Sequence, residues 1–259
     1  MKKTTTILCL GIALCMLGCS DDDDQVTTTS TVPFSLTASL SPRSSDAEDT
    51  GILQGNWDAN SQLAVIKTGS SGVPKSILTR KTDSSDTFTG NLSTLVKNEN
   101  EIAVFYPAAA ITANSSDTLT QTLNLSGQDG TLAGITNYDY LWAQCKAGMN
   151  ETTGSSACEM TSLVTIGKFQ FTVNGGSPLN NITRITITAT AGTLYSSAVM
   201  KLKNGEFSST QTGNITIKNK AGISGTTYIS FFPSEAQLHF TLVTLSLIHI
   251  SEPTRHAQI

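Results

Sequence analysis

Short apolar runs that alternate with polar residues recur along most of the chain, and clusters of Gly, Asn, Ser and Asp separate them. Alternation with a period of two residues is the pattern of a β-strand that buries one face. No stretch of a dozen residues keeps the longer period of an amphipathic helix. Short strands at this spacing favour an all-β sandwich over a fold that alternates strands with helices. The pattern predicts strands at residues 32–40, 62–67, 87–95, 101–106, 118–125, 138–144, 161–173, 181–190, 196–203, 213–218, 226–232 and 237–244.

Two local patterns, one at a turn and one within a strand, carry more specific signals. Asn204-Gly205 lies between two strand-like runs and predicts a two-residue hairpin. Within residues 161–173 the apolar side chains change parity between Ile166 and Phe169. A β-bulge at Gly167, between them, would return both side chains to one face of the strand.

The first eighteen residues have the composition of a signal peptide. Two lysines precede an apolar stretch, residues 7–17, which is too short to span a bilayer as a helix. The stretch ends in Met16-Leu17-Gly18-Cys19, which resembles the lipobox cleaved by lipoprotein signal peptidase. That cleavage needs a small residue before the cut and a thiol after it. We expect residues 1–18 to be removed and Cys19 to carry the lipid anchor; the alternative is a plain secretory signal with an incidental cysteine.

Residues 19–31 are predicted to be an extended tether. A run of four aspartates, residues 21–24, repels itself and stays solvated, and a polar, Thr-rich linker follows at residues 25–31. The acidic run also resembles the export signal that sends lipoproteins to the outer face of the outer membrane in some Gram-negative bacteria. The expected location is therefore the bacterial cell surface.

Composition limits the number of domains and the class of partner. A chain of 259 residues with 38% apolar residues can bury the core of one large β-domain or of two small ones. A break rich in Gly, Asn, Thr and Ser at residues 148–156 predicts a boundary between two lobes, residues 32–150 and 158–244. The net charge is −4 and no basic patch stands out, so we do not expect nucleic acid as a partner.

Cys145 and Cys158 flank that break. Outside the cytoplasm, two cysteines so close in sequence can oxidise, and closing so short a loop contributes about 3 kcal/mol in the chain-entropy model. The alternative is a pair of unpaired, buried thiols. The sequence leaves both interpretations open.

The last fifteen residues do not continue the pattern. Residues 245–255 are similar to the peptide that results when a sequencing adapter is translated as coding sequence. We therefore expect residues 245–259 to be non-native and the second lobe to be incomplete. On this interpretation His249 and His256 have no function.

The sequence offers little catalytic chemistry. Outside the tail, His239 is the one histidine, and the strand pattern predicts that it faces solvent. No metal-ligand spacing, phosphate-binding Gly-rich loop or nucleophile elbow appears. The carboxylates Asp129, Asp139 and Glu159 are scattered along the chain, and nothing pairs them as a glycosidase would require. We expect no cofactor, no metal and no enzyme activity.

Aromatic residues suggest a different kind of site. Tyr138, Tyr140 and Trp142 share a parity and would form a row on one face of a strand, and Trp57 is a further candidate. Such a row usually packs in a core. The alternative is a sugar-binding strip in which Trp142 and Tyr140 contact a glycan.

Several short motifs follow one another in a recognisable order. Cys19 is followed by a strand that ends before Arg43. A Trp-acidic turn-strand segment, a Tyr-Pro strand, a Gln-Asp-Gly turn and a Tyr-Asp-aromatic segment come next, at residues 57–65, 101–107, 125–132 and 138–143. Taken in this order, the motifs resemble the fimbrillin family, the lipoprotein-derived pilus subunits and accessory proteins of Gram-negative anaerobes. The resemblance covers about residues 19–244.

The resemblance implies two transthyretin-like β-sandwich lobes and assembly by strand exchange. In that scheme an arginine-specific protease cuts at Arg43 and removes the lipidated segment that holds strand 32–40. The strand of a neighbouring pilus subunit then fills the groove by β-augmentation. The predicted function is a fimbrial structural or adhesion subunit, with other pilus subunits and the outer membrane as partners. The alternative is a surface glycan- or nutrient-binding lipoprotein; a hydrolase would need a carboxylate pair or a metal site beyond residue 244.

Overall fold

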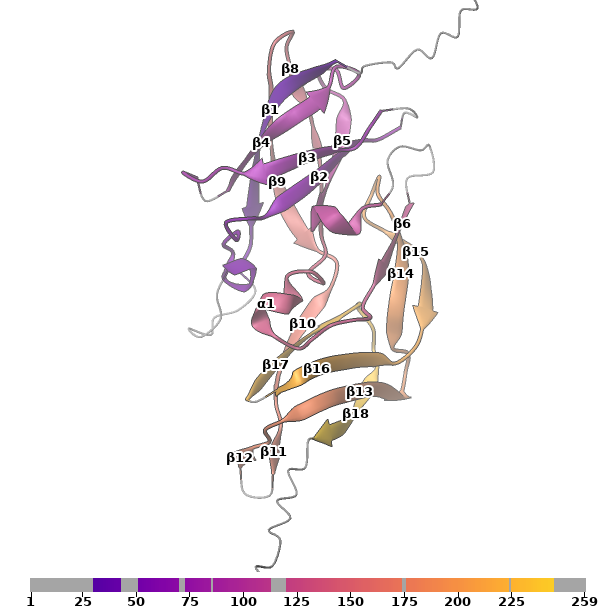
Figure 1. Cartoon of the computed structure of the whole chain (residues 1–259). Helices are drawn as coiled ribbons and strands as arrows, with labels where there is room; N and C mark the ends of the chain where they lie inside the picture. The colour runs from indigo at the N-terminus through magenta and orange to yellow at the C-terminus, as the bar shows by residue number, and fades with distance from the viewer. Residues whose placement is uncertain are drawn as a thin grey trace, which may run out of the picture.

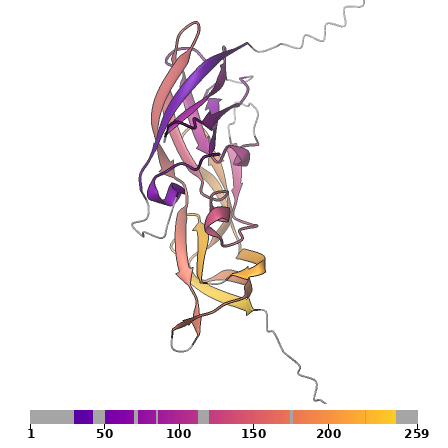
Figure 2. The ribbon, with the colours of Figure 1, turned by 60° about the vertical axis from the view of Figure 1, so that its left-hand side comes forward.

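The computed structural model describes residues 30–42, 51–69, 73–84, 86–112, 120–173, 176–223 and 225–244. Strands dominate these residues, and the helical elements are η1 (Gly51–Gln54), η2 (Ala108–Ala110) and α1 (Leu132–Ile135). The all-β class predicted from the alternation is confirmed. No helix in these ranges is long and apolar enough to cross a membrane. Figures 1 and 2 show an elongated molecule made of two lobes, one above the other.

The upper lobe in Figure 1 is a sheet of eight strands. Its strands are β1 (Thr31–Leu40), β2 (Gln62–Lys67), β3 (Ser76–Arg80), β4 (Thr87–Ser93), β5 (Glu101–Tyr106), β7 (Leu141–Lys146), β8 (Gly148–Met149) and β9 (Gly154–Ser162). Their order is β1-β4-β3-β2-β5-β7-β9-β8, and β1 also pairs with β9. Because of this second pairing the sheet closes on itself. Its inward side chains form one buried cluster that includes Leu36, Leu63, Phe88 and Val104.

The lower lobe contains several smaller sheets. One joins β6 (Thr120–Asn124), β14 (Tyr195–Lys201) and β15 (Phe207–Thr212), and another joins β13 (Ile182–Ala191), β16 (Ile215–Ile223) and β18 (Gln237–Thr244). Two pairs of strands complete it, β10 (Thr165–Gln170) with β17 (Thr226–Phe231) and β11 (Thr172–Val173) with β12 (Ser177–Pro178). Along β13, buried Ile185 and Ile187 alternate with more exposed threonines, as the sequence pattern predicts.

An apolar core joins the two lobes. The outer face of the closed sheet contributes Ile66 and Phe105 to the same buried cluster as Ile185 and Met200 of the lower lobe, and Tyr140, just before β7, belongs to this cluster too. A buried amide also ties the loop that follows β6 to β17. Gln128 is 1% exposed; its Nε2 donates to the carbonyls of Leu125 and Ser230, and its Oε1 accepts from the Ser230 N–H. The lobes are therefore packed against each other, rather than joined only by a linker.

The structure corrects the predicted lobe boundary. Residues 148–156 form the β8–β9 hairpin turn and the first part of β9 inside the upper lobe, and the upper-lobe strands continue to the end of β9 at Ser162. In addition, β6 lies between β5 and β7 in sequence but pairs with β14 of the lower lobe. In the first case β9 also pairs with the distant strand β1, and in the second β6 pairs with the distant strand β14, and local composition does not report either pairing.

The predicted hairpin and the predicted bulge have different outcomes. The hairpin at Asn204-Gly205 forms between β14 and β15, but its loop is longer than two residues, since the Lys201 N–H donates to the Glu206 carbonyl. The bulge at Gly167 is absent, because β10 pairs with β17 in regular register through that residue. Ile166 and Phe169 therefore lie on opposite faces of β10, and they pack against two different buried clusters.

Candidate functional site

Strand β1 closes the upper sheet. It pairs antiparallel with β4, from Thr31↔Ser93 to Thr37↔Thr87, and parallel with β9, from Phe34↔Gly154 to Leu40↔Met160. Figure 2 shows the indigo β1 beside the salmon β9 along its length. In the described part of the chain no pairing joins β4 to β9 directly. The sheet would therefore open if β1 were removed.

The side chains of β1 explain why it is held. Phe34, Leu36 and Ala38 are 2%, 0% and 0% exposed, and they point into the core of the closed sheet. The residues between them are half-buried or exposed. A slot left by β1 would thus offer two rows of unpaired backbone groups and space for three alternating apolar side chains. Such a slot suits an extended segment of similar pattern.

Polar contacts fasten the C-terminal half of β1. The indole Nε1 of Trp57 donates to the Ala38 carbonyl at 2.6 Å, and the buried ring packs edge-on against Phe88 and Tyr106. Ser39 and Ser41 donate from their hydroxyls to the Cys158 carbonyl and to Glu159 Oε1. Trp57 therefore supports β1, whereas the sequence had offered it as an aromatic candidate for sugar binding.

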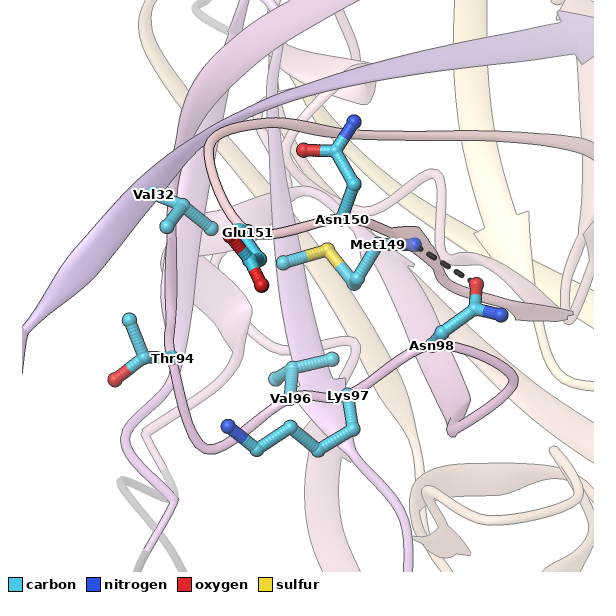
Figure 3. Close-up of a pocket in the computed structure, with 8 residues that line it drawn as sticks. All are labelled: Val32, Thr94, Val96, Lys97, Asn98, Met149, Asn150 and Glu151. Atoms are coloured by element: carbon cyan, nitrogen blue, oxygen red, sulfur yellow. Dashed lines mark hydrogen bonds between the residues drawn. The ribbon is translucent and has the colours of Figure 1, made fainter.

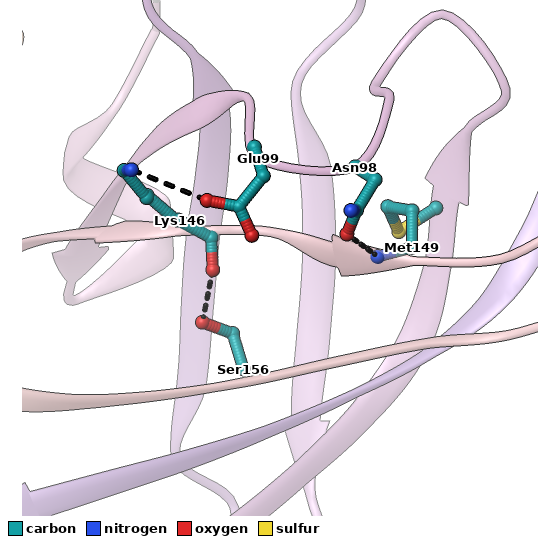
Figure 4. A network of polar contacts seen from close by, with 5 residues as sticks. All are labelled: Asn98, Glu99, Lys146, Met149 and Ser156. Atoms are coloured by element: carbon teal, nitrogen blue, oxygen red, sulfur yellow. Dashed lines mark hydrogen bonds and ion pairs between the residues drawn. The ribbon is translucent and has the colours of Figure 1, made fainter.

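A cavity of about 310 Å³ lies near the start of β1. Its lining residues are Val32, Thr94, Val96, Lys97, Asn98, Met149, Asn150 and Glu151. Figure 3 shows the Met149 thioether pointing into the space between Val32 and Val96, with polar groups around it. The loops around this cavity are tied together, as Figure 4 shows: Asn98 Oδ1 accepts from the Met149 N–H at 3.0 Å, and Lys146 pairs with Glu99 at 3.2 Å. The cavity suits an apolar side chain at the end of the β1 slot.

The two cysteines of the upper lobe are free thiols that lie close together. Both are partly buried, and both pack against the core of the closed sheet. A hydrogen bond from the Cys158 thiol lowers the pKa of Cys145 to about 7, and the Ser156 hydroxyl, 3.2 Å from the sulfur, acts in the same direction. The same pairing, followed by burial, raises the pKa of Cys158. Because both are free thiols in the structure, a disulfide between Cys145 and Cys158 stays a prediction.

The carboxylates noted in the sequence have different surroundings in the structure. Asp129 accepts from the N–H and the hydroxyl of Thr131 beside helix α1, Asp139 is fully buried, and Glu159 accepts from Ser41 on the surface. His239 is exposed on β18. Within the described ranges no three His, Cys, Asp or Glu residues gather in a group that could hold a metal ion.

The aromatic row lies in the core between the lobes. Tyr140 is 4% exposed, and its hydroxyl donates to the Asn124 carbonyl at 2.7 Å. Burial raises the pKa of Tyr140 to about 12. Trp142 is partly buried and its Nε1 donates to the Leu202 carbonyl at 2.8 Å. The interpretation of these two residues as glycan contacts does not fit, because the second lobe covers the face on which they lie.

Two predicted site residues, Cys19 and Arg43, lie outside the described residues. Arg43 follows directly after the described segment 30–42 that contains β1. What the sequence analysis missed is the parallel pairing of β1 with β9. The alternation of Phe34, Leu36 and Ala38 signals a half-buried strand, but it does not say which strands lie on either side.

Comparison with known proteins shows similarity in fold. No protein-family model matches the chain, and no curated protein is similar to it in sequence. A candidate cell adhesion protein from Bacteroides uniformis has a TM-score of 0.50 at 16% identity, over 82% of this chain and 80% of that chain. A candidate cell adhesion protein from Bacteroides ovatus gives 0.49 at 14% identity, over 82% and 86% of the two chains. A fimbrial assembly protein from Parabacteroides distasonis gives 0.42 at 13% identity, over 84% and 83%. The first of these three supports a shared fold.

Proposed function

We propose that this chain is a structural or adhesion subunit of a bacterial surface pilus, without catalytic activity, and that it assembles by strand exchange at the place of β1. The observation that carries the proposal is the position of β1, which joins β4 to β9 and contributes three alternating side chains to the core. The Bacteroides uniformis protein, which supports a shared fold with this chain, is a candidate cell adhesion protein. The sequence resemblance to fimbrillins points the same way.

In the proposed sequence of events, Cys19 first carries the lipid that anchors the chain to the outer membrane. Cleavage after Arg43 then separates β1 covalently from the rest of the subunit. From that point β1 has no covalent link to the subunit, and it is held by its backbone pairing, its three apolar side chains and the hydrogen bonds that involve Trp57, Ser39 and Ser41. An extended segment of a neighbouring subunit can replace it, because such a segment restores the backbone hydrogen bonds with β4 and β9.

A closing strand suits this role better than an edge strand would. An edge strand that leaves exposes a single row of backbone groups, whereas β1 leaves two rows that face each other. A replacement strand is then fixed on both sides and in register. This double pairing is what a fibre needs at each joint between subunits, because the joint carries the load.

The proposal can be tested by treating the full chain with an arginine-specific protease. We expect cleavage after Arg43 and, in concentrated protein, multimers that resist dissociation in detergent. An Arg43→Ala variant should stay monomeric. Arg184→Ala is the matched control, since Arg184 is an exposed arginine of the lower lobe, and this variant should assemble like the parent chain. Assembly of Arg43→Ala to the same extent as the parent would contradict the proposal.

No observation of the structure favours the alternative of a glycan-binding lipoprotein. Its basis in the sequence was the aromatic row, and Tyr140 and Trp142 are covered by the lower lobe. Retention of the full chain on one of a panel of immobilised polysaccharides, abolished by free polysaccharide, would revive it.

A further inference from the structure

Cys145 on β7 and Cys158 on β9 stand opposite each other across two neighbouring strands. The pairs Leu141↔Ser162 and Trp142↔Thr161 fix the register of β7 against β9. The pairs Gly148↔Ser155 and Met149↔Gly154 of the β8–β9 hairpin have the same register. Continued between these two stretches, that register places Cys145 opposite Cys158.

The local geometry suits a bond between the two sulfurs. The Leu163 N–H donates to the Tyr140 carbonyl, so the alternation of an antiparallel pair puts Cys145 and Cys158 at a non-hydrogen-bonded position. Side chains come closest at such positions, with Cα atoms about 4.5 Å apart, which lies within the range that a disulfide spans. Both side chains point to the same face, toward the core of the closed sheet.

The stretch between the paired ends of β7 and β9 is held in an unusual way. There the Ser156 hydroxyl, a side-chain group, donates to the Lys146 carbonyl at 2.7 Å, as Figure 4 shows. The same hydroxyl lies 3.2 Å from the Cys145 sulfur, and the Cys158 sulfur lies 3.9 Å from that of Met160. The backbone pairing of β7 with β9 ends at Trp142↔Thr161. A covalent bond here would therefore reinforce the side of β9 that faces β7, where side-chain contacts now hold it.

The other side of β9 is the wall of the β1 slot. Ala38 of β1 is the register partner of Cys158, and the Ser39 hydroxyl donates to the Cys158 carbonyl. If β1 leaves, β9 loses all of these partners along residues 154–160. Its remaining neighbours are β7 and β8, and Cys158 lies at the centre of the strand that they must hold.

We propose that Cys145 and Cys158 form a cross-strand disulfide that fastens β9 to β7. The part of this proposal that concerns assembly rests on the proposed function: the bond keeps one wall of the β1 slot in place while β1 is exchanged. The signal-like N-terminus predicts that the chain is exported to an oxidising compartment. There a protein disulfide or a small-molecule disulfide can act as the oxidant.

The oxidation balances as a thiol–disulfide exchange. The Cys145 thiolate attacks one sulfur of the oxidant R–S–S–R and releases R–S⁻, which leaves a mixed disulfide on Cys145. The Cys158 thiolate then attacks the Cys145 sulfur and displaces the second R–S⁻. Two electrons pass from the cysteine pair to the oxidant, the two thiol protons end on the released thiols, and one disulfide bond forms in the chain.

The first test is chemical. The purified full chain is incubated with oxidised glutathione, denatured without reductant, alkylated with iodoacetamide and mapped by mass spectrometry. We expect the peptides that contain Cys145 and Cys158 to be joined and unalkylated, and to separate after reduction. Recovery of both cysteines as alkylated thiols, or as separate glutathione adducts, would overturn the proposal. Neither result depends on whether the chain forms pili.

The second test measures the effect of the bond on β9. Amide hydrogen exchange in residues 156–160 should be slower in the oxidised chain than in the reduced chain. The oxidised chain should also unfold roughly 5–10 °C higher. A Cys145→Ser/Cys158→Ser double variant is the control and should show neither redox-dependent difference. Equal exchange of residues 156–160 in both redox states would show that the disulfide does not hold β9, whatever the outcome of pilus assembly.

Discussion

Replacing Leu36 by alanine tests how firmly β1 is built into the closed sheet. Leu36 is 0% exposed and lies in the middle of β1, with Phe88 of β4 and Ser156 of β9 as register partners. Truncation removes buried apolar surface and leaves a cavity, and substitutions of this kind cost about 2–5 kcal/mol. We expect the urea midpoint of the Leu36→Ala chain to fall by an amount that corresponds to this loss.

The same substitution should change strand exchange more sharply than folding. After cleavage at Arg43, β1 is a bound segment instead of a covalent part of the subunit. A loss of about 3 kcal/mol then weakens its binding on the order of 100-fold. Fluorescence anisotropy of a labelled β1 peptide, displaced from the cleaved chain by unlabelled peptide, measures this change directly. We expect the Leu36→Ala peptide to compete at a concentration about 100-fold higher than the parent peptide.

Thr37 offers the matched control for this experiment. It is the next residue of β1, it is exposed, and it pairs with Thr87. Thr37→Ala should shift the free energy of unfolding by no more than about 0.5 kcal/mol and leave peptide displacement nearly unchanged. If Leu36→Ala and Thr37→Ala behaved alike in both assays, β1 would not be packed as the structure shows, and the reasoning would be refuted.

Three further substitutions test other parts of the structure. Trp57→Phe removes the donor to the buried Ala38 carbonyl and should lower the free energy of unfolding by about 1–3 kcal/mol in urea titrations; an unchanged midpoint would show that this hydrogen bond is dispensable. Gly205→Ala should lower the melting temperature more than Gly69→Ala. Both glycines have positive φ, but a new Cβ at Gly205 lies 2.7 Å from the Trp142 ring, whereas one at Gly69 meets nothing within 4 Å. Equal melting temperatures would argue against the packing of Trp142 on this turn. Burial raises the pKa of Tyr140 to about 12, above its ordinary value of 10, so the unfolded chain loses this proton first and stability should fall as pH rises from 10 toward 12. Tyr140→Phe should weaken that fall when unfolding is measured at several alkaline pH values, and an identical pH profile would contradict it.

Local alternation was enough to place many of the strands. The predicted strands 62–67, 101–106 and 237–244 coincide with β2, β5 and β18. A strand with one face against a core alternates apolar and polar residues, and a strand with both faces against a core is continuously apolar. The outward position of His239 follows from the same alternation in β18.

The pairing of distant strands was not predictable from the same pattern. Strand β9 is rich in serine and was assigned in part to a boundary loop, yet it is a strand because β1 pairs with it on one side and β7 and β8 on the other. Strand β6 was found in the sequence, but its partner in the lower lobe was not. In both cases tertiary contacts decide, and local propensity does not contain them.

The candidate site was predictable only in part. The sequence showed that Tyr140 and Trp142 share a face, but not that a second lobe covers that face. It showed Cys145 and Cys158 close in sequence, but not that the register sets them opposite each other beside β1. The parity of a strand tells which residues lie together, and what lies against them depends on the rest of the fold.

The most direct test of strand exchange is the N-terminus of the subunits in assembled multimers. Multimers would be isolated from cells that export the full chain and separated from unassembled protein, and the first residues of their subunits would be read by mass spectrometry. The account predicts subunits that begin at Ser44 and have lost β1. Multimers whose subunits still begin at the lipid-bearing Cys19, with β1 attached, would contradict it.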